Sequence, residues 1–254
     1  MKRARTKTYK AMMIDVDGTL IQNRRDGIPS PRVTKAIEQA KKRIHIGVAT
    51  ARPLFLMQEI LSHLSLSGPL ILNNGAQIID AHHKKILWEQ KIREEDIDPV
   101  CAVFQSLKIP IIIHDRNGDH VIAKQRYDRK SVYNIFSINS SPKKGQQAAQ
   151  KLSHIPTIVV HTVSDWEEGK VSIVVSHAQA TKQHGIFEVA KILGIETHEI
   201  IGIGDGYNDF PLLMACGLKV AMGNAVEELK AIAHYVAPSV DDDGVADVIE
   251  KFVL

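Results

Sequence analysis

The chain has 254 residues, enough to bury the core of one large domain or of a core with a smaller companion. Its net charge is only +3 and aromatic residues make up 5%, whereas nucleic-acid binders more often show a basic face with interleaved aromatics, so we expect no nucleic-acid partner. No run of about 18 apolar residues occurs, so we expect no membrane span. The basic segment 1–10 is interpreted as a flexible tail. Cys101 and Cys216, each within an apolar helical pattern, are interpreted as buried thiols of a cytoplasmic protein.

The first eighty residues alternate strand and helix patterns. The stretch KAMMIDV at 10–16 is a continuous apolar run, typical of a strand buried on both faces. A serine–proline pair at 30–31 marks the start of a helix, and IHIGVAT at 44–50 is a second buried strand. Another helix is expected over 52–64, and a third strand over 69–76 ends in a turn. This alternation predicts a parallel sheet with helices on its faces.

The pattern changes near residue 85 and returns after residue 180. Between these points, short strands joined by polar turns, such as RNGD at 116–119, accompany helix-like stretches at 94–108 and 143–153. They predict an antiparallel or mixed sheet. We therefore expect an α/β protein with a Rossmann-like core of residues 1–84 and 179–254, helices on both faces of its parallel sheet, and a smaller α+β cap domain inserted at 85–178.

Polar side chains gather where the predicted core strands end. The carboxyl ends of parallel strands meet at one edge of a sheet, so these groups are expected to lie close together. Each group alone is also compatible with an ordinary turn. The residues concerned are Asp15 and Asp17, Thr50 and Arg52, Asn73 and Asn74, and finally Asp205, Asn208 and Asp209.

The sequence disfavours both an EF-hand and a zinc site. An EF-hand starting at Asp15 would need glycine and glutamate where the chain has Leu20 and Asp26, so that interpretation fails. The histidines of AHHKK at 81–85 are adjacent rather than spaced along a helix, which disfavours zinc. The acidic run at 241–244 is interpreted as a loop entering the last helix. Carboxylates from two strand ends favour a magnesium and phosphate site instead.

Four motifs carry a family resemblance. DVDGTL at 15–20, VATARP at 48–53, ATKQHG at 180–185 and GDGYND at 204–209 resemble, in this order, the motifs of the haloacid dehalogenase superfamily of phosphotransferases. The insertion between the second and third motifs, with NNGA before it, is similar to the Cof-type branch, class IIB. The resemblance covers nearly the whole core on both sides of the insertion.

The resemblance implies a catalytic role for each of four residues. Asp15 would be the nucleophile that forms an aspartyl-phosphate, and Asp17 would be the general acid and then the base. Thr50 would hydrogen-bond the transferring phosphoryl group, and Lys182 would neutralise its charge.

The resemblance also implies Mg²⁺ as cofactor. The metal-site residues would be Asp15, Asp17 through its backbone carbonyl, Asp205 and Asp209, the last of which would support the metal or orient Lys182. The substrate-binding residues would be Thr50, Ala51, Arg52, Asn74, Gly75, Lys182 and Asn208.

Other interpretations stay open for single residues. Thr50 could cap the following helix, and Arg52 and Lys182 could be surface residues. The NNG sequence at 73–75 is also a strong turn signal. In the insertion, the stretches 114–116 and 124–130 are candidates for reading the substrate, although solvated surface is the interpretation we favour for their charges: His114, Asp115, Arg116 and the KQRYDRK run.

The expected function is a magnesium-dependent phosphatase acting on small phosphorylated metabolites, with sugar or polyol phosphates as the expected substrates. The alternatives are a sugar phosphomutase, which class IIB also contains, and a non-catalytic metabolite-binding protein on the same fold. The expected partner is a small phosphorylated metabolite, and the oligomeric state, monomer or homodimer, is left open.

Overall fold

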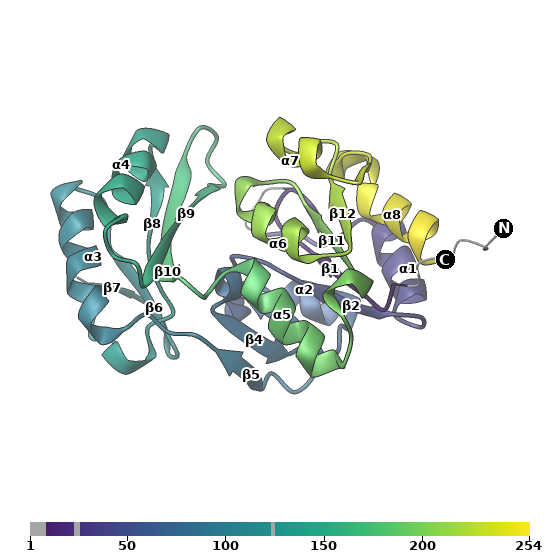
Figure 1. Ribbon diagram of the computed structural model, residues 1–254, viewed down its shortest axis with the longest axis horizontal. Helices are drawn as coiled ribbons and strands as arrows, with labels where there is room; N and C mark the ends of the chain where they lie inside the picture. The colour runs from purple at the N-terminus through teal and green to yellow at the C-terminus, as the bar shows by residue number, and fades with distance from the viewer. Residues whose placement is uncertain (1–8, 23–25, 123–124) are drawn as a thin grey trace.

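The computed structural model describes residues 9–22, 26–122 and 125–254. Most of the basic N-terminal segment and Lys124 of the KQRYDRK run therefore lie outside the described residues. The chain forms two lobes, a core built from its described N- and C-terminal parts and a cap built from its middle part (Figure 1). No helix in the described ranges is both long and apolar enough to cross a membrane.

The core is organised around a five-stranded parallel sheet of order β13-β12-β11-β1-β2. β1 pairs with β11 on one side and with β2 on the other. All four of its residues are buried, as the unbroken apolar run predicted. The strands are β1 (Ala11–Ile14), β2 (His45–Val48), β11 (Ile200–Gly204), β12 (Leu218–Ala221) and β13 (Tyr235–Val236).

Helices cover both faces of this sheet, which confirms the predicted fold class. α1 lies beside α8 on one side, and α5 lies beside α6 on the other (Figure 1). α1 begins after Ser30, whose hydroxyl accepts a hydrogen bond from the Val33 amide. The core helices are α1 (Pro31–Ala40), α2 (Gln58–Leu64), α5 (Lys182–Leu193), α6 (Phe210–Ala215), α7 (Glu227–Ile232) and α8 (Gly244–Phe252).

The single helix expected over 52–64 is divided in two. A 3₁₀ turn, η1 (Leu54–Leu56), precedes α2, which begins only at Gln58. The remaining core 3₁₀ turns are η2 (Asn73–Gly75), η4 (Thr197–Glu199), η5 (Tyr207–Asp209) and η6 (Val240–Asp242). η2 follows β3 directly and η5 begins three residues after the end of β11, so both turns carry polar residues of those strand ends.

A three-stranded antiparallel sheet extends the core toward the cap. It consists of β3 (Pro69–Leu72), β4 (Gln77–Asp80) and β5 (Ile86–Glu89) in that order. A parallel bridge between Ala49 and Ile71 places β3 beside the end of β2. The sequence interpretation assigned 86–89 to the inserted domain, but β5 pairs with β4 rather than with the cap sheet. The boundary near residue 85 remains a prediction.

The cap is a five-stranded antiparallel sheet of order β7-β6-β8-β10-β9, covered on one face by two helices. α3 (Glu94–Ser106) and α4 (Pro142–Leu152) lie on the side away from the core (Figure 1). Ile113, Ile135 and Ile173 pack with them in one buried cluster. The strands are β6 (Ile112–Asp115), β7 (Gly118–Val121), β8 (Asn134–Ser140), β9 (Ile158–Ser164) and β10 (Val171–His177), and the 3₁₀ turn η3 (Arg129–Ser131) precedes β8.

A small buried cluster joins the two lobes where the chain passes between them. It consists of Ala76, Tyr133 and Ala180, and we call it the junction cluster. Next to it, Gly75 has a φ of +105°, and a Cβ atom at this position would lie 2.2 Å from the carbonyl oxygen of Thr181. This backbone therefore approaches the start of α5 more closely than any side chain would permit.

Substitution of Gly75 tests this close approach. Gly75→Ala combines a strained positive φ with a clash against backbone, so we expect a loss of roughly 2 to 5 kcal/mol in the free energy of unfolding. Gly118→Ala is the matched control, because Gly118 has a φ of +122° and open space around the added Cβ. Its cost should be only about 1 kcal/mol. Urea unfolding of both variants measures these costs, and equal losses in the free energy of unfolding would contradict the proposed clash.

Candidate active site

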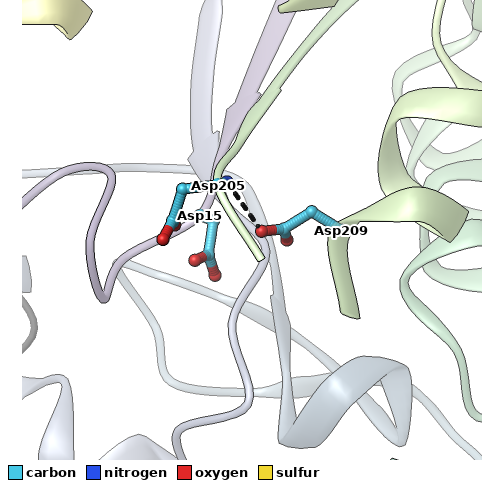
Figure 2. A group of neighbouring side chains, drawn as sticks. All are labelled: Asp15, Asp205 and Asp209. Carbon is cyan, nitrogen blue, oxygen red and sulfur yellow. Dashed lines mark hydrogen bonds between the residues drawn. The ribbon is translucent and has the colours of Figure 1, made fainter. Parts of the chain in front are cut away.

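Three carboxylates meet at the carboxyl edge of the parallel sheet. Asp15 follows β1 directly, and Asp205 and Asp209 follow β11, whose Ile203 is paired with Ile14 of β1. One carboxylate oxygen from each aspartate lies within 4.8 Å of the others, and Figure 2 shows the three side chains around this point. The adjacent strands thus bring together acids that are about 190 residues apart in sequence, as the strand-end pattern predicted.

Lys182 connects two of these carboxylates. It is the first residue of α5, and its Nζ atom donates to Asp15 Oδ1 and to Asp209 Oδ1, both at 2.6 Å. Its side chain is only 1% exposed, so the alternative of a surface lysine is wrong. Burial opposes the charge of the ammonium group, but the two carboxylates outweigh it and raise the pKa of Lys182. The residue is therefore a fixed positive charge beside Asp15.

Both oxygens of Asp209 already have partners. Oδ1 accepts from Lys182, and Oδ2 accepts from the backbone amides of Asp205 and Gly206, each at 3.0 Å. The two hydrogen bonds to Oδ2 fix the turn after β11. Of the two roles expected for Asp209, this arrangement favours orientation of Lys182 over direct support of a metal.

The other two acids, Asp15 and Asp205, both have raised pKa values. Burial, followed by repulsion from Asp209, raises the pKa of Asp15 well above its usual value, while Lys182 acts in the opposite direction. The same two causes raise the pKa of Asp205 to about 7, although a hydrogen bond of 2.7 Å from Thr19 Oγ1 opposes the shift. With one lysine among three carboxylates, the cluster has an excess of negative charge that a cation would relieve.

Asp17 is not one of the three grouped carboxylates. Arg52 binds it with two hydrogen bonds, Nε to Oδ2 at 2.9 Å and Nη2 to Oδ1 at 2.6 Å. Trp166 lies in the loop between β9 and β10 of the cap, and its Nε1 donates to Asp17 Oδ1 at 3.3 Å. The Arg52 guanidinium lies 5.6 Å from the centre of the Trp166 ring. Arg52 is buried, so the alternative of a surface residue is wrong. The carboxylate of Asp17 is thus bound by the Arg52 guanidinium and the Trp166 indole and is not grouped with the other three carboxylates.

The expected phosphoryl and substrate residues occupy the neighbouring strand ends. Thr50 is buried, and its Oγ1 accepts from the Arg52 amide at 3.1 Å instead of capping a helix. The Asn74 amide donates to the Thr50 carbonyl at 2.9 Å. The Asn74 side chain contacts that of Asn208 at 3.5 Å. Ala51 and Gly75 lie within the same two turns, where only their backbones can take part in binding.

Two cap residues differ from the expectation of solvated surface. His114 and Asp115 are buried, while Arg116 is exposed as expected. Asp115 accepts from His120 Nε2 at 2.8 Å and from the amides of two loop residues, Asn117 and Asp128. Its role is therefore to hold the β6–β7 turn, and the charge pattern misled because its partner lies on the adjoining strand.

Sequence reasoning missed three further contributors to the site. Thr19 orients Asp205, and Trp166 reaches Asp17 from the cap. Asn224 donates from Nδ2 to the carbonyl of Gly18 at 2.8 Å and so supports the turn after β1. Thr19 lies inside the DVDGTL motif at 15–20, whereas Asn224 and Trp166 lie outside the four motifs, and the contact of Trp166 depends on how the cap is placed.

Comparison with known proteins agrees with this geometry. The family model for haloacid dehalogenase-like hydrolases matches residues 12–126 and 115–249. A phosphoglycolate phosphatase of Methanopyrus kandleri is 26% identical, over 95% of this chain and 96% of its own. The 5-amino-6-(5-phospho-D-ribitylamino)uracil phosphatase YcsE of Bacillus subtilis is 24% identical, over 96% of each chain.

A solved structure supports the fold. The structure of a subclass IIB sugar phosphatase of the same superfamily superimposes with a TM-score of 0.78, at 24% identity, over 96% of this chain and 98% of that one. The family model spans nearly the whole chain, and the four sequence motifs lie within the residues that it matches. The chain therefore belongs to the haloacid dehalogenase-like hydrolases, in their Cof-type branch, and is a phosphoric monoester hydrolase.

Proposed function

We propose that the protein is a magnesium-dependent phosphatase that hydrolyses small phosphorylated metabolites, chiefly sugar or polyol phosphates, through an aspartyl-phosphate. The observation that carries this proposal is the buried contact of Lys182 with Asp15 at 2.6 Å, beside the second strand-end acid Asp205. A nucleophile, a fixed cation and a group of oxygen ligands thus surround one point.

The residues present fit a divalent cation. Asp15, Asp205 and the backbone carbonyl of Asp17 would hold Mg²⁺, which prefers oxygen ligands and usually binds through one or two carboxylates. When bound, the ion supplies positive charge to the oxygens of the transferring phosphoryl group. Burial and then repulsion from Asp209 raise the pKa of Asp205 to about 7, and a bound cation would oppose both effects.

The first chemical step uses Asp15 and Asp17. A carboxylate oxygen of Asp15 forms a bond to phosphorus while the bond from phosphorus to the leaving oxygen breaks. Asp17 gives its proton to that oxygen, so that a neutral alcohol departs. Lys182 and Thr50 stabilise the charge on the phosphoryl group during the transfer.

The second step regenerates the enzyme. Asp17, now ionised, removes a proton from a water molecule as its oxygen attacks phosphorus, and the bond between phosphorus and Asp15 breaks to release inorganic phosphate. The two hydrogen bonds from Arg52 hold the Asp17 carboxyl group in one orientation. Asp15 returns as a carboxylate paired with Lys182.

The relatives support a phosphatase without selecting one substrate. The names of two of them refer to phosphoglycolate and to a phosphoribityl compound, whose leaving groups differ in charge and in hydroxyl content. The substrate class proposed for this chain therefore rests on its own site. A cytoplasmic location, favoured by the two buried free cysteines, belongs to the same proposal.

The phosphatase and the phosphomutase alternative are separated by a substrate panel. Sugar and polyol phosphates incubated with Mg²⁺ should release inorganic phosphate, measured colorimetrically. A mutase would leave free phosphate unchanged while the position of the phosphate on the sugar changes, which ³¹P NMR detects. A non-catalytic binding protein would bind members of the panel in calorimetry and alter none of them.

Asp15→Asn should abolish turnover. The variant lacks the nucleophilic carboxylate, so we expect phosphate release to fall on the order of 10⁴-fold or more. Asp241→Asn, the same change at an exposed carboxylate, should keep wild-type activity. Mass spectrometry of acid-quenched protein should find phosphate on the wild-type protein but not on Asp15→Asn. Turnover equal to wild type in that variant would contradict the mechanism.

Asp17→Asn should depend on the leaving group. General acid–base catalysis contributes about 10² to 10⁴-fold, so alkyl phosphates should lose activity by this factor. The first step with p-nitrophenyl phosphate needs no proton on the leaving group, and its burst of p-nitrophenol should survive. Equal losses of the first step on both substrates would exclude Asp17 as the acid.

Removal of metal should make stability depend on pH through Asp205. A carboxyl whose folded-state pKa is about 7 binds a proton more tightly in the native than in the unfolded protein, so it lowers stability as pH rises from about 4 to 7. Without metal, Asp205→Asn should therefore gain stability relative to wild type between pH 5 and pH 8. Mg²⁺ should raise the melting temperature of wild type at pH 8, and of the variant much less.

Differential scanning calorimetry with and without a chelator measures these effects. Glu38→Gln, on the exposed face of α1, is the control for a lost carboxylate and should follow wild type at every pH. An Asp205→Asn protein that Mg²⁺ stabilises as strongly as wild type would show that the ion binds elsewhere.

A further inference from the structure

Three buried polar atoms in the described ranges lack a hydrogen-bond partner. They are Asn74 Nδ2 in the core, and Asn134 Oδ1 and His161 Nε2 in the cap. An unsatisfied buried polar atom costs free energy, so each calls for an explanation. The catalytic steps described above use neither of the two cap residues.

The three residues surround the junction cluster. Asn74 lies two positions before Ala76, and Asn134 directly follows Tyr133. The ring of His161 lies close enough to the Ala180 backbone and to the charge of Lys182 for both to influence its pKa. Because Ala76, Tyr133 and Ala180 form one buried group, the three unpartnered atoms come from segments that meet at a single place between core and cap.

The strand register turns both cap residues toward the core. His161 of β9 is paired with Val174 of β10, which is paired with Phe136 of β8. Residues paired in this way share a face, and the alternate residues Ile135 and Ile173 face the cap helices. The row with His161 therefore lies on the opposite face, and β9 lies against η5, which carries Asn208.

The neighbouring row places Asn134 on the same face. Asn134 is paired with Ser176, and Ser176 with Val159. In the core, Asn208 contacts Asn74 at 3.5 Å, so the turn against which β9 packs also touches the third unpartnered residue. Lys182, two residues after Ala180, connects this region to Asp15.

The chemistry of the three atoms is complementary to hydroxyl groups. Burial, together with the positive charge of Lys182, lowers the pKa of His161 to about 4, so the ring is neutral at pH 7. A neutral imidazole has one nitrogen that donates and one that accepts, so the unpartnered Nε2 can bind a hydroxyl group in either tautomer. Asn134 Oδ1 is an acceptor, and Asn74 Nδ2 is a donor.

No lysine or arginine lies in the two rows of side chains on this face of the cap sheet. One row is His161, Val174, Phe136 and Ile112, and the other is Val159, Ser176, Asn134 and His114, whose Nδ1 is paired with Asp119 Oδ1 at 2.7 Å. A carboxylate or a second phosphate on the leaving group would find no lysine or arginine among them, whereas a hydroxyl can both donate to and accept from the three unpartnered atoms.

We propose that Asn134 and His161, together with Asn74, form the leaving-group subsite, and that it takes the hydroxyl groups of an uncharged sugar or polyol. This assignment deepens the proposed function and rests on it. The phosphoryl group lies at Asp15 and Lys182, and the hydroxylated part of the substrate extends from there toward the junction cluster.

A pair of substrates that differ only in hydroxyl groups tests the subsite. Glycerol 1-phosphate and propyl phosphate share a three-carbon chain and a phosphate. His161→Phe and Asn134→Leu keep the bulk of the side chains and remove their unpartnered polar atoms. We expect kcat/KM on glycerol 1-phosphate to fall about 10-fold in each variant, as for loss of one hydrogen bond, and to change less than about 2-fold on propyl phosphate.

Rescue and surface variants separate recognition from structure. His161→Gln keeps a hydrogen-bonding group at this position and should retain more activity on glycerol 1-phosphate than His161→Phe. His154→Phe and Gln147→Leu, at exposed positions of the cap, are matched controls and should behave as wild type on both substrates. Melting temperatures of all variants check that each is folded.

The outcomes distinguish the subsite from the phosphatase itself. Equal losses on the two substrates, or none, would overturn the subsite while phosphate release by wild type upholds the proposed function. If wild type releases no phosphate from either substrate, the proposed function fails, and calorimetric binding of glycerol 1-phosphate then decides the subsite. Weaker binding by His161→Phe than by wild type would support it, and equal or absent binding would overturn it.

Discussion

The contact of Lys182 with Asp15 and Asp209 is the interaction on which the rest of the site depends. It joins three chain segments, because Asp15 follows β1, Asp209 lies in the turn after β11, and Lys182 begins α5. A buried ion pair is costly to form and strongly destabilising to break. Its position is therefore specified by the fold around it, chiefly by the pairing of β1 with β11 and by the packing of Gly75 against Thr181.

The sequence predicted the core well because local patterns determine it. The buried strands are short apolar runs, and the acids follow them directly, so a parallel sheet leaves those acids only one edge to share. The family motifs then assigned roles to Asp15, Thr50 and Lys182, and the fold brings these residues together. The assigned roles remain predictions, but their proximity is a property of the structure.

The surroundings of some residues depend on distant segments, so one stretch of sequence does not predict them. The pairing of β5 with β4 is one case, since no local pattern distinguishes β5 from a strand of the inserted domain. Asp115 is charged and follows a strand, yet it is buried because His120 and two loop amides satisfy it. His161 and Trp166 face the site only because the whole cap sheet is placed over it, and no periodicity in one sequence encodes that placement.

The contact between Trp166 and Asp17 has a consequence for how the enzyme cycles. Asp15 and Lys182 are buried, and Trp166 of the cap contacts Asp17 of the core. An opening of the cap would break this contact and replace the indole beside Asp17 and Arg52 with water. Asp17 would then have one environment with the cap open and another with the cap closed. Indole fluorescence would report the change directly, since the chain has only two tryptophans and Trp88 lies on β5, away from the moving hairpin.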